Sequence, residues 1–449
     1  MAGTMYLSLL LVLLGTIASL AALTRKYLLN TVTMICGMWF ASALLASFRW
    51  NDMIPYSERV YGIIALGCAG VAAGDLFTRL LTQRVYGKTK NTPAIYENNA
   101  YSLNMRAILC FQVFCTAYYL WMCLKSVQLL HEGQTFADIR TQYQGYAGTE
   151  STLSNLELAI GNHIAKSFIF VMMPTALVIL FTRKAVRYRR TALALTALDL
   201  LLYSLYTAGR IILLVGLFDA LILISLYKEN INKRTVVIAK RIGWMACAAI
   251  FFISIFRVTD HGNWGIWKTV YAYVSTPVAL MSHWIERIDA SVRPMNGMAL
   301  SNGLFDVLDI FLKRLAITFP SHRECKEIIS AFETFVPVYG GNKINAFVSA
   351  FTYFYLDGRE TGVFLFSALT GMAGCFFEER ALKKPDLLSL LTYMLLMQAI
   401  VKFLFKWEFA SSGYVLAFVY LRVIFVRRGR WCWRRGGGMP GTLPLAPLK

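Results

Sequence analysis

The stretch Leu201–Tyr227 constrains this chain most, because two apolar runs meet there with almost no polar loop between them. Each run, taken with its neighbours, approaches the roughly 20 residues that a helix needs to cross a bilayer. The runs meet at Ala208–Arg210, where Gly209 permits a tight turn. The sequence therefore predicts a helical hairpin in a membrane, with Arg210 at its tip.

Composition also indicates a membrane protein. Of the 449 residues, 57% are hydrophobic and 16% are charged, and the mean hydropathy is +0.52. These values exclude an ordinary soluble enzyme. The nine cysteines form no CxxC pair and lie mostly in apolar runs, which favours buried side chains over a disulfide framework or a zinc site.

Apolar runs recur along the chain and predict an all-α, polytopic membrane protein with about eleven transmembrane helices. The loops assigned to one side account for essentially the whole net charge of +20, which places the N-terminus outside and the C-terminus in the cytoplasm. Charge spread over such loops does not indicate nucleic-acid binding. We expect residues 1–426 to form one multi-pass domain and residues 427–449 a basic, disordered cytoplasmic tail. The predicted spans are Met5–Leu23, Tyr27–Phe48, Val60–Leu81, Ala107–Leu124, Ala165–Thr182, Thr191–Ala208, Ile211–Tyr227, Ile242–Phe256, Thr361–Phe377, Leu387–Phe405 and Phe409–Phe425.

Two loops predicted on the outer side, about 125–166 and 257–360, are too long to be simple turns. The second is nearly balanced in charge and contains helix signals. Ser321–Glu324 after Pro320 is typical of a capping box, and Asn302 is a candidate cap for an earlier helix. We therefore expect a large external loop containing amphipathic helices that lie on the outer leaflet.

Three carboxylates fall inside predicted spans: Asp75, Asp199 and Asp219. The last two lie about ten residues on either side of Gly209, which places both near the bilayer midplane. Such groups are functional candidates and could form part of a proton relay, which would favour a transporter. They could equally be neutral or paired structural residues, with Arg422 as one candidate partner.

All five histidines fall in the two long outer loops, and none has the spacing of an HExxH metal site. The chain also lacks a D-x-D triplet that would hold a metal-bound nucleotide diphosphate. We therefore expect no metal and no cofactor.

An arginine at the tip of a membrane hairpin has two interpretations. Arg210 could be an anchor that snorkels to lipid headgroups. Alternatively, its planar guanidinium could bind phosphate oxygens in a bidentate manner.

The residues around this tip resemble a known family. The segment YTAGRIILL, Tyr206–Leu214, resembles the hairpin tip of bacterial oligosaccharide repeat-unit polymerases, the Wzy-type O-antigen polymerases. The segment Asn342–Gly362 resembles the N-x-[YF]-T…YY-D-[FL]-G-x-x-G segment of that family, and the order of spans and large loop is similar. This chain departs from the pattern at Val348, where the family usually has Thr, and at Gly358, which follows Asp357 directly instead of an aromatic residue.

The resemblance implies a metal-independent glycosyltransferase in the bacterial cytoplasmic (inner) membrane. Its donor and acceptor would be polyprenyl-diphosphate-linked oligosaccharides, which it joins into a surface polysaccharide such as O-antigen, capsule or exopolysaccharide. It also implies the lipid bilayer, a chain-length regulator and a flippase as partners. Two alternatives remain open: an O-antigen ligase, and a polyprenyl-glycan flippase or other transporter.

A reaction of this kind needs cations for the leaving diphosphate, a base for the attacking hydroxyl and a groove for sugar. The candidate catalytic residues are Arg210, Arg257, Asp357 and His283. The candidate substrate-binding residues are Tyr206, Gly209, Arg287, Arg293, Asn345 and Gly358.

Overall fold

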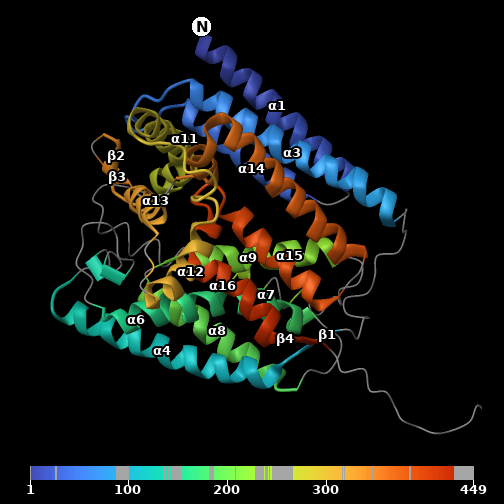
Figure 1. The fold of residues 1–449 in the computed structure, drawn as a ribbon, viewed down its shortest axis with the longest axis vertical. Coiled ribbons are helices and arrows are strands. Elements are labelled where there is room, and N and C mark those ends of the chain that lie inside the picture. Colours follow the sequence, from blue (N-terminus) through green and yellow to red (C-terminus); the bar gives the residue numbers. More distant parts are fainter. Residues whose placement is uncertain are drawn as a thin grey trace, which may run out of the picture.

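The chain folds mainly into helices (Figure 1). The computed structural model describes residues 2–25, 28–86, 101–134, 138–139, 142–143, 153–181, 187–207, 209–227, 237, 241, 243–244, 266–315, 317, 319–340, 342–344, 348–383 and 386–428. The α-helices are α1 (Ala2–Arg25), α2 (Thr31–Ser47), α3 (Arg59–Tyr86), α4 (Met105–His131), α6 (Asn155–Ala159), α7 (Lys166–Phe181), α8 (Arg189–Tyr206), α9 (Ile211–Tyr227), α11 (Ile266–Ser291), α12 (Asn302–Arg314), α13 (Pro320–Ala331), α14 (Ala350–Lys383), α15 (Leu387–Val401) and α16 (Ser412–Tyr420). Shorter elements are the π-helices η1 (Ile160–Ala165) and η4 (Leu421–Phe425) and the 3₁₀ helix η3 (Glu408–Ala410).

Five stretches of the described residues are long and apolar enough to cross a membrane: Met5–Arg25, Arg59–Thr82, Met105–His131, Asn155–Phe181 and Ala350–Lys383. Four apolar helices are shorter: Thr31–Ser47, Ile211–Leu226, Leu387–Val401 and Ser412–Phe425. These helices support a polytopic membrane protein. Each predicted span overlaps a helix except Ile242–Phe256, which lies almost wholly outside the described residues.

The hairpin of α8 and α9 is organised around Gly209. Helix α9 begins at Ile211 and ends at Tyr227, as predicted. The Gly209 N–H donates to the carbonyl of Ser204 at 3.1 Å, and a Cβ at this position would lie 2.9 Å from the Thr207 hydroxyl oxygen. Glycine is therefore suited to the turn because a side chain would be crowded there.

Helices α3 and α14 form the most extensive helix pair (Figure 1). A Cβ at Gly74 would lie 1.9 Å from the carbonyl oxygen of Ala368, and one at Gly371 would lie 2.1 Å from that of Val71. The two backbones can approach this closely because both positions lack a side chain, which is a common basis for helix association in membranes.

Two antiparallel strand pairs mark opposite ends of the bundle (Figure 1). Strand β1 (Tyr101–Leu103) pairs with β4 (Val426–Arg428), so the first residues of the predicted tail form a strand, and residues 429–449 lie outside the described part. Strand β2 (Val336–Tyr339) pairs with β3 (Asn342–Ile344) near α13. We call the two regions the β1–β4 end and the α12–α13 end.

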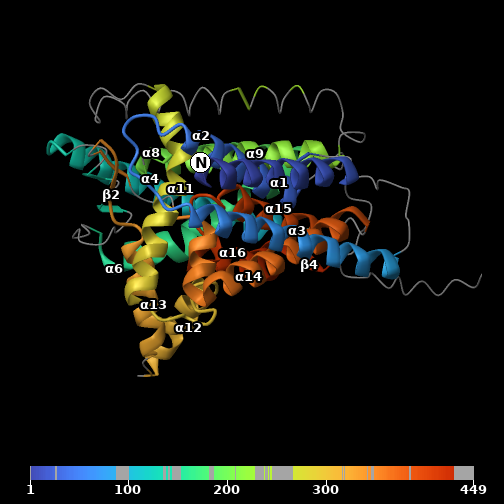
Figure 2. The same ribbon diagram turned by 90° about the horizontal axis from the view of Figure 1, so that it is seen from above.

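Helix α11 lies across the α12–α13 end, almost perpendicular to α1, α3 and α14 (Figure 2). Helices α12 and α13 follow at the same end, where the sequence predicted amphipathic helices. Phe311 and Leu315 of that segment are exposed. The predicted capping box is wrong: α13 begins at Pro320, which is preorganised for the first helical position, and its cap residue Phe319 has no capping side chain.

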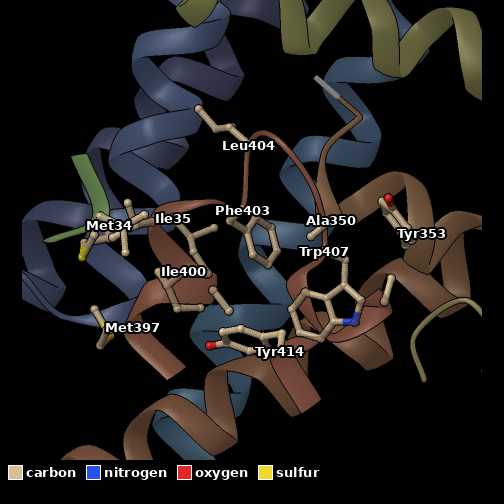
Figure 3. Close-up of a cluster of buried hydrophobic side chains, with 14 of the residues drawn as sticks. Met34, Ile35, Ala350, Tyr353, Met397, Ile400, Phe403, Leu404, Trp407 and Tyr414 are labelled. Carbon is tan, nitrogen blue, oxygen red and sulfur yellow. The ribbon is translucent and has the colours of Figure 1, made fainter. Parts of the chain in front are cut away.

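The predicted cap at Asn302 is also wrong, because Ser301 is the cap residue of α12 and Asn302 donates instead to the Ala410 carbonyl at 2.9 Å. This bond ties α12 to the loop between α15 and α16. Phe403 and Trp407 anchor the same loop in the apolar core (Figure 3). Charged residues lie next to these aromatic residues in the loop, as Lys402 does to Phe403 and Glu408 does to Trp407. Burial of the aromatic side chains therefore also sets the positions of the charged residues.

Candidate functional site

Arg210 lies at the start of α9, half-buried, and contacts α11. Its Nη2 donates to the Tyr273 hydroxyl at 3.1 Å, and its guanidinium lies over the Tyr273 ring at 5.4 Å. The hairpin tip is thus joined to the crossing helix. The second predicted arginine, Arg257, lies outside the described residues.

Tyr206, a predicted substrate contact, is the last residue of α8 and is buried. Its ring packs against Tyr203 and Tyr119, with centroid separations of 5.3 and 5.9 Å. The neighbouring predicted contact, Gly209, makes the turn described above. The packing of Tyr206 is that of a core aromatic residue.

Three further predicted residues lie on or just after α11. The His283 ring packs edge-on against Trp284, and the Arg287 guanidinium lies over Trp284 at 5.3 Å. Burial, together with the charge of Arg287, lowers the pKa of His283 below its ordinary value. His283 is therefore neutral near pH 7, which is the form that a general base requires. Arg293, just beyond the helix, is exposed.

Asp357 is buried where α14 breaks at Gly358 and Arg359. Its two carboxylate oxygens accept the N–H groups of Ala299 and Leu300, at 2.9 and 2.6 Å. The carboxylate therefore holds the connection between α11 and α12, and these bonds favour a structural role. Asn345, from the same family-like segment, lies outside the described residues.

The structure also brings together charged residues that are not among the predicted site residues. Lys402 Nζ lies 3.3 Å from Glu408 Oε1, and these side chains are 7% and 3% exposed. Lys406 Nζ lies 3.8 Å from Glu333 Oε1. Lys166, at the start of α7, interacts electrostatically with all four of these groups. We call these five residues the lysine cluster; it lies at the α12–α13 end of the bundle.

The lysines of the lysine cluster favour the ionised form of Glu408. Burial alone would raise the pKa of Glu408, but the surrounding lysines outweigh this effect and the pKa lies below its ordinary value. With Glu408 ionised, the cluster holds three ammonium groups against two carboxylates.

The carboxylates inside the predicted spans have other partners than Arg422. Asp75 pairs with Arg25 and with Arg79. Asp199 accepts a hydrogen bond from the Thr116 hydroxyl, and Asp219 accepts one from Gln398 Nε2 at 2.7 Å. Among the described residues, none of the three pairs with Arg422.

One signal for the lysine cluster was present in the sequence. Lys402 falls inside the predicted span Leu387–Phe405, and a lysine there is costly unless it is paired or functional. Lys166, by contrast, stands at the end of an apolar run, where snorkelling is the ordinary interpretation.

Comparisons with protein-family models, with curated proteins and with solved structures find no match to this chain. The resemblance to the repeat-unit polymerases therefore depends on the two motifs and the layout of the chain.

Proposed function

We propose that this chain is an oligosaccharide repeat-unit polymerase of the Wzy type. It joins polyprenyl-diphosphate-linked oligosaccharides into a surface polysaccharide, without a metal. The lysine cluster is the observation that carries the proposal. It gathers cations in excess where α7 begins and α15 ends, and preorganised cations can stabilise the charge on a leaving diphosphate.

The proposal includes a membrane topology. About eleven spans cross a bacterial cytoplasmic membrane, with the N-terminus outside, the C-terminus inside and the α12–α13 end facing outward. Two features support this arrangement. Strands β1 and β4 adjoin, and both flank segments predicted in the cytoplasm. The bridge between Met53 and Tyr339, and the bond from Trp407 Nε1 to the Leu300 carbonyl at 2.8 Å, join segments predicted outside.

The proposed reaction transfers a glycan from one lipid to another. The terminal hydroxyl of the acceptor glycan loses its proton to neutral His283, and its oxygen attacks the anomeric carbon of the donor. The bond from that carbon to the diphosphate breaks, and polyprenyl diphosphate leaves. We assign the base to His283 because the oxygens of Asp357 already accept backbone N–H groups. Arg210, together with Arg257, would stabilise the leaving group.

A glycan ladder tests this function. A strain that lacks the chain should lose long surface polysaccharides and keep caps of a single repeat unit, and complementation should restore the ladder. Loss of all surface glycan would point instead to the ligase or flippase. An unchanged ladder would reject all three.

Cysteine labelling tests the orientation separately. Engineered cysteines near Gly148 and Asn302 should react with an impermeant reagent in intact cells, and cysteines near Arg187 and Lys233 should not. Labelling near Arg187 in intact cells would overturn the proposed topology.

A further inference from the structure

Lys166 lies at an unusual junction in the helix bundle. It follows the π-helical turn η1, a helix type that occurs frequently at functional sites. The start of α16 lies against it, since a Cβ at Gly413 would be 3.5 Å from Lys166 Cδ and 2.3 Å from the Asn162 carbonyl oxygen. Lys166 is therefore held by packing of its aliphatic stem, and its position is set by the fold.

Lys166 has no counter-ion of its own. Lys402 pairs with Glu408, and Lys406 pairs with Glu333. No ion pair or hydrogen bond joins the Lys166 ammonium to any residue within the described ranges, although all four of the other charges act on it. Because a half-buried ammonium without a partner is unfavourable, the cluster lacks one negative charge.

The surroundings of Lys166 suit a phosphate group with a sugar attached. The Lys406–Glu333 separation of 3.8 Å is long for an ion pair, and both side chains are about one-third exposed. Lys406 is therefore accessible to a phosphate oxygen. Glu408 Oε2 is buried and has no hydrogen-bond partner among the described residues, so it can accept a sugar hydroxyl.

The phenols of Tyr203 and Tyr353 interact electrostatically with Lys406 and Glu408. Neither hydroxyl makes a hydrogen bond with a residue in the described part of the chain. Both can serve as donors to a phosphate or a sugar.

We propose that the lysine cluster is the binding site for the diphosphate of a lipid-linked glycan, with Lys166 and Lys406 contacting the phosphates and Glu408 the adjoining sugar. The identity of the lipid and its second phosphate rest on the proposed function, whereas the recognition of phosphate rests on the surplus cation of the cluster. A bilayer phospholipid offers the same phosphate chemistry with one phosphate, and the test must separate the two.

The test uses the full chain, purified and placed in phosphatidylcholine nanodiscs. Polyprenyl diphosphate should raise the thermal unfolding midpoint, polyprenyl monophosphate should raise it less, and polyprenol should leave it unchanged. Lys166→Gln should weaken diphosphate binding about tenfold or more, the scale of one hydrogen bond to a charged group. Lys313→Gln removes one exposed lysine from the same end of the molecule and should bind as the parent does.

The unliganded unfolding midpoint of Lys166→Gln shows that the variant is folded. Wild-type affinity in that folded variant would overturn the assignment. Equal protection by phosphatidylglycerol would also overturn it, in favour of a lipid anchor. The two proposals can fail separately: a ladder that needs the chain but not Lys166 would refute this site alone. Binding that depends on Lys166, with an unchanged ladder in the deletion strain, would refute the polymerase alone.

Discussion

Two clusters of buried charge lie at opposite ends of the bundle and differ in how their charges are matched. At the β1–β4 end, Arg25 pairs with Asp75 and Glu378, and Arg79 pairs with Asp75 at 2.9 Å. Two cations there meet two carboxylates. In the lysine cluster, three cations meet two carboxylates.

The difference separates a structural role from a binding role. The balanced cluster joins α1, α3 and α14, and its Arg25 and Glu378 side chains are 3% and 1% exposed. Because its charges neutralise one another, this cluster needs no bound ion or ligand to balance its charge. The lysine cluster has a surplus cation and exposed members, so its charge can be completed by a ligand.

The largest effect should come from breaking the balanced cluster. Arg25→Met leaves Asp75 and Glu378 buried without their shared cation, which should cost about 3–5 kcal/mol in the free energy of unfolding. Titration of the purified protein with SDS would measure this. The triple variant that adds Asp75→Asn and Glu378→Gln removes the orphaned charges and should recover most of the loss. Arg25→Met with parental stability would show that the cluster is not a structural element.

The second prediction contrasts two lysines within the lysine cluster. Lys402→Gln removes the partner of buried Glu408 and should cost about 3 kcal/mol, whereas Lys402→Gln combined with Glu408→Gln should cost less. Lys166→Gln should stay within about 1 kcal/mol of the parent, because it removes a surplus charge. The same SDS titration measures all three variants. If Lys166→Gln lowered the free energy of unfolding more than Lys402→Gln does, Lys166 would not be a surplus charge.

How far the sequence predicts this fold depends on whether the signal is local. Helix α9 was predicted at its observed bounds because a continuous apolar run and Gly209 define both of its limits. Helix α2 was predicted to start at Tyr27, but it starts at Thr31. The reason is a cap: Asn30 accepts a hydrogen bond from the Thr33 N–H at 3.0 Å.

The candidate site was less predictable because its residues come together only in the folded chain. Lys166 and Lys402 are far apart in sequence. Lys166 adjoins an apolar run where a lysine is unremarkable, and the position of Lys402 inside a predicted span does not identify its partners. The position of Asp357 was identified through a motif, but the motif could not show that its oxygens bind the backbone of residues 299 and 300. Only the fold reveals which charges lack partners.

The third prediction concerns Arg210, which contacts Tyr273 at the α12–α13 end. Arg210→Ala should abolish long glycans, and Arg210→Lys should leave a weak ladder, because lysine keeps the charge but loses the bidentate geometry. The leaving diphosphate gains charge in the transition state, so the effect should be mainly on rate. Ladder intensity normalised to membrane abundance measures it.

Tyr273→Phe is the matched control for Arg210, because it removes the hydroxyl that Arg210 contacts at 3.1 Å and retains the ring. It should keep most of the ladder. Full activity of Arg210→Lys would instead favour a snorkelling anchor, and Arg210 would then belong with the structural charges.

The smallest effect on the free energy of unfolding should come from a change at Asp219, which belongs to neither cluster. Asp219 is fully buried, and its Oδ2 accepts from Gln398 Nε2 at 2.7 Å. Asp219 Oδ1 and Gln398 Oε1 have no hydrogen-bond partner among the described residues. A proton on Asp219 would let it donate to that amide oxygen, so that carboxylic acid and amide form a mutual pair. Asp219 would then be neutral and would need no cation, unlike Asp75.

Asp219→Asn tests this, because an amide can make the same two hydrogen bonds to Gln398. It should change the free energy of unfolding by less than about 1 kcal/mol and preserve the ladder. Asp219→Leu leaves the Gln398 amide unsatisfied and should cost about 1–3 kcal/mol. If Asp219→Asn folds normally but loses all activity, the acid has a proton-relay role and the transporter alternative gains. If it destabilises as strongly as Asp219→Leu, the acid is ionised, and a buried carboxylate can persist here without a direct cation partner.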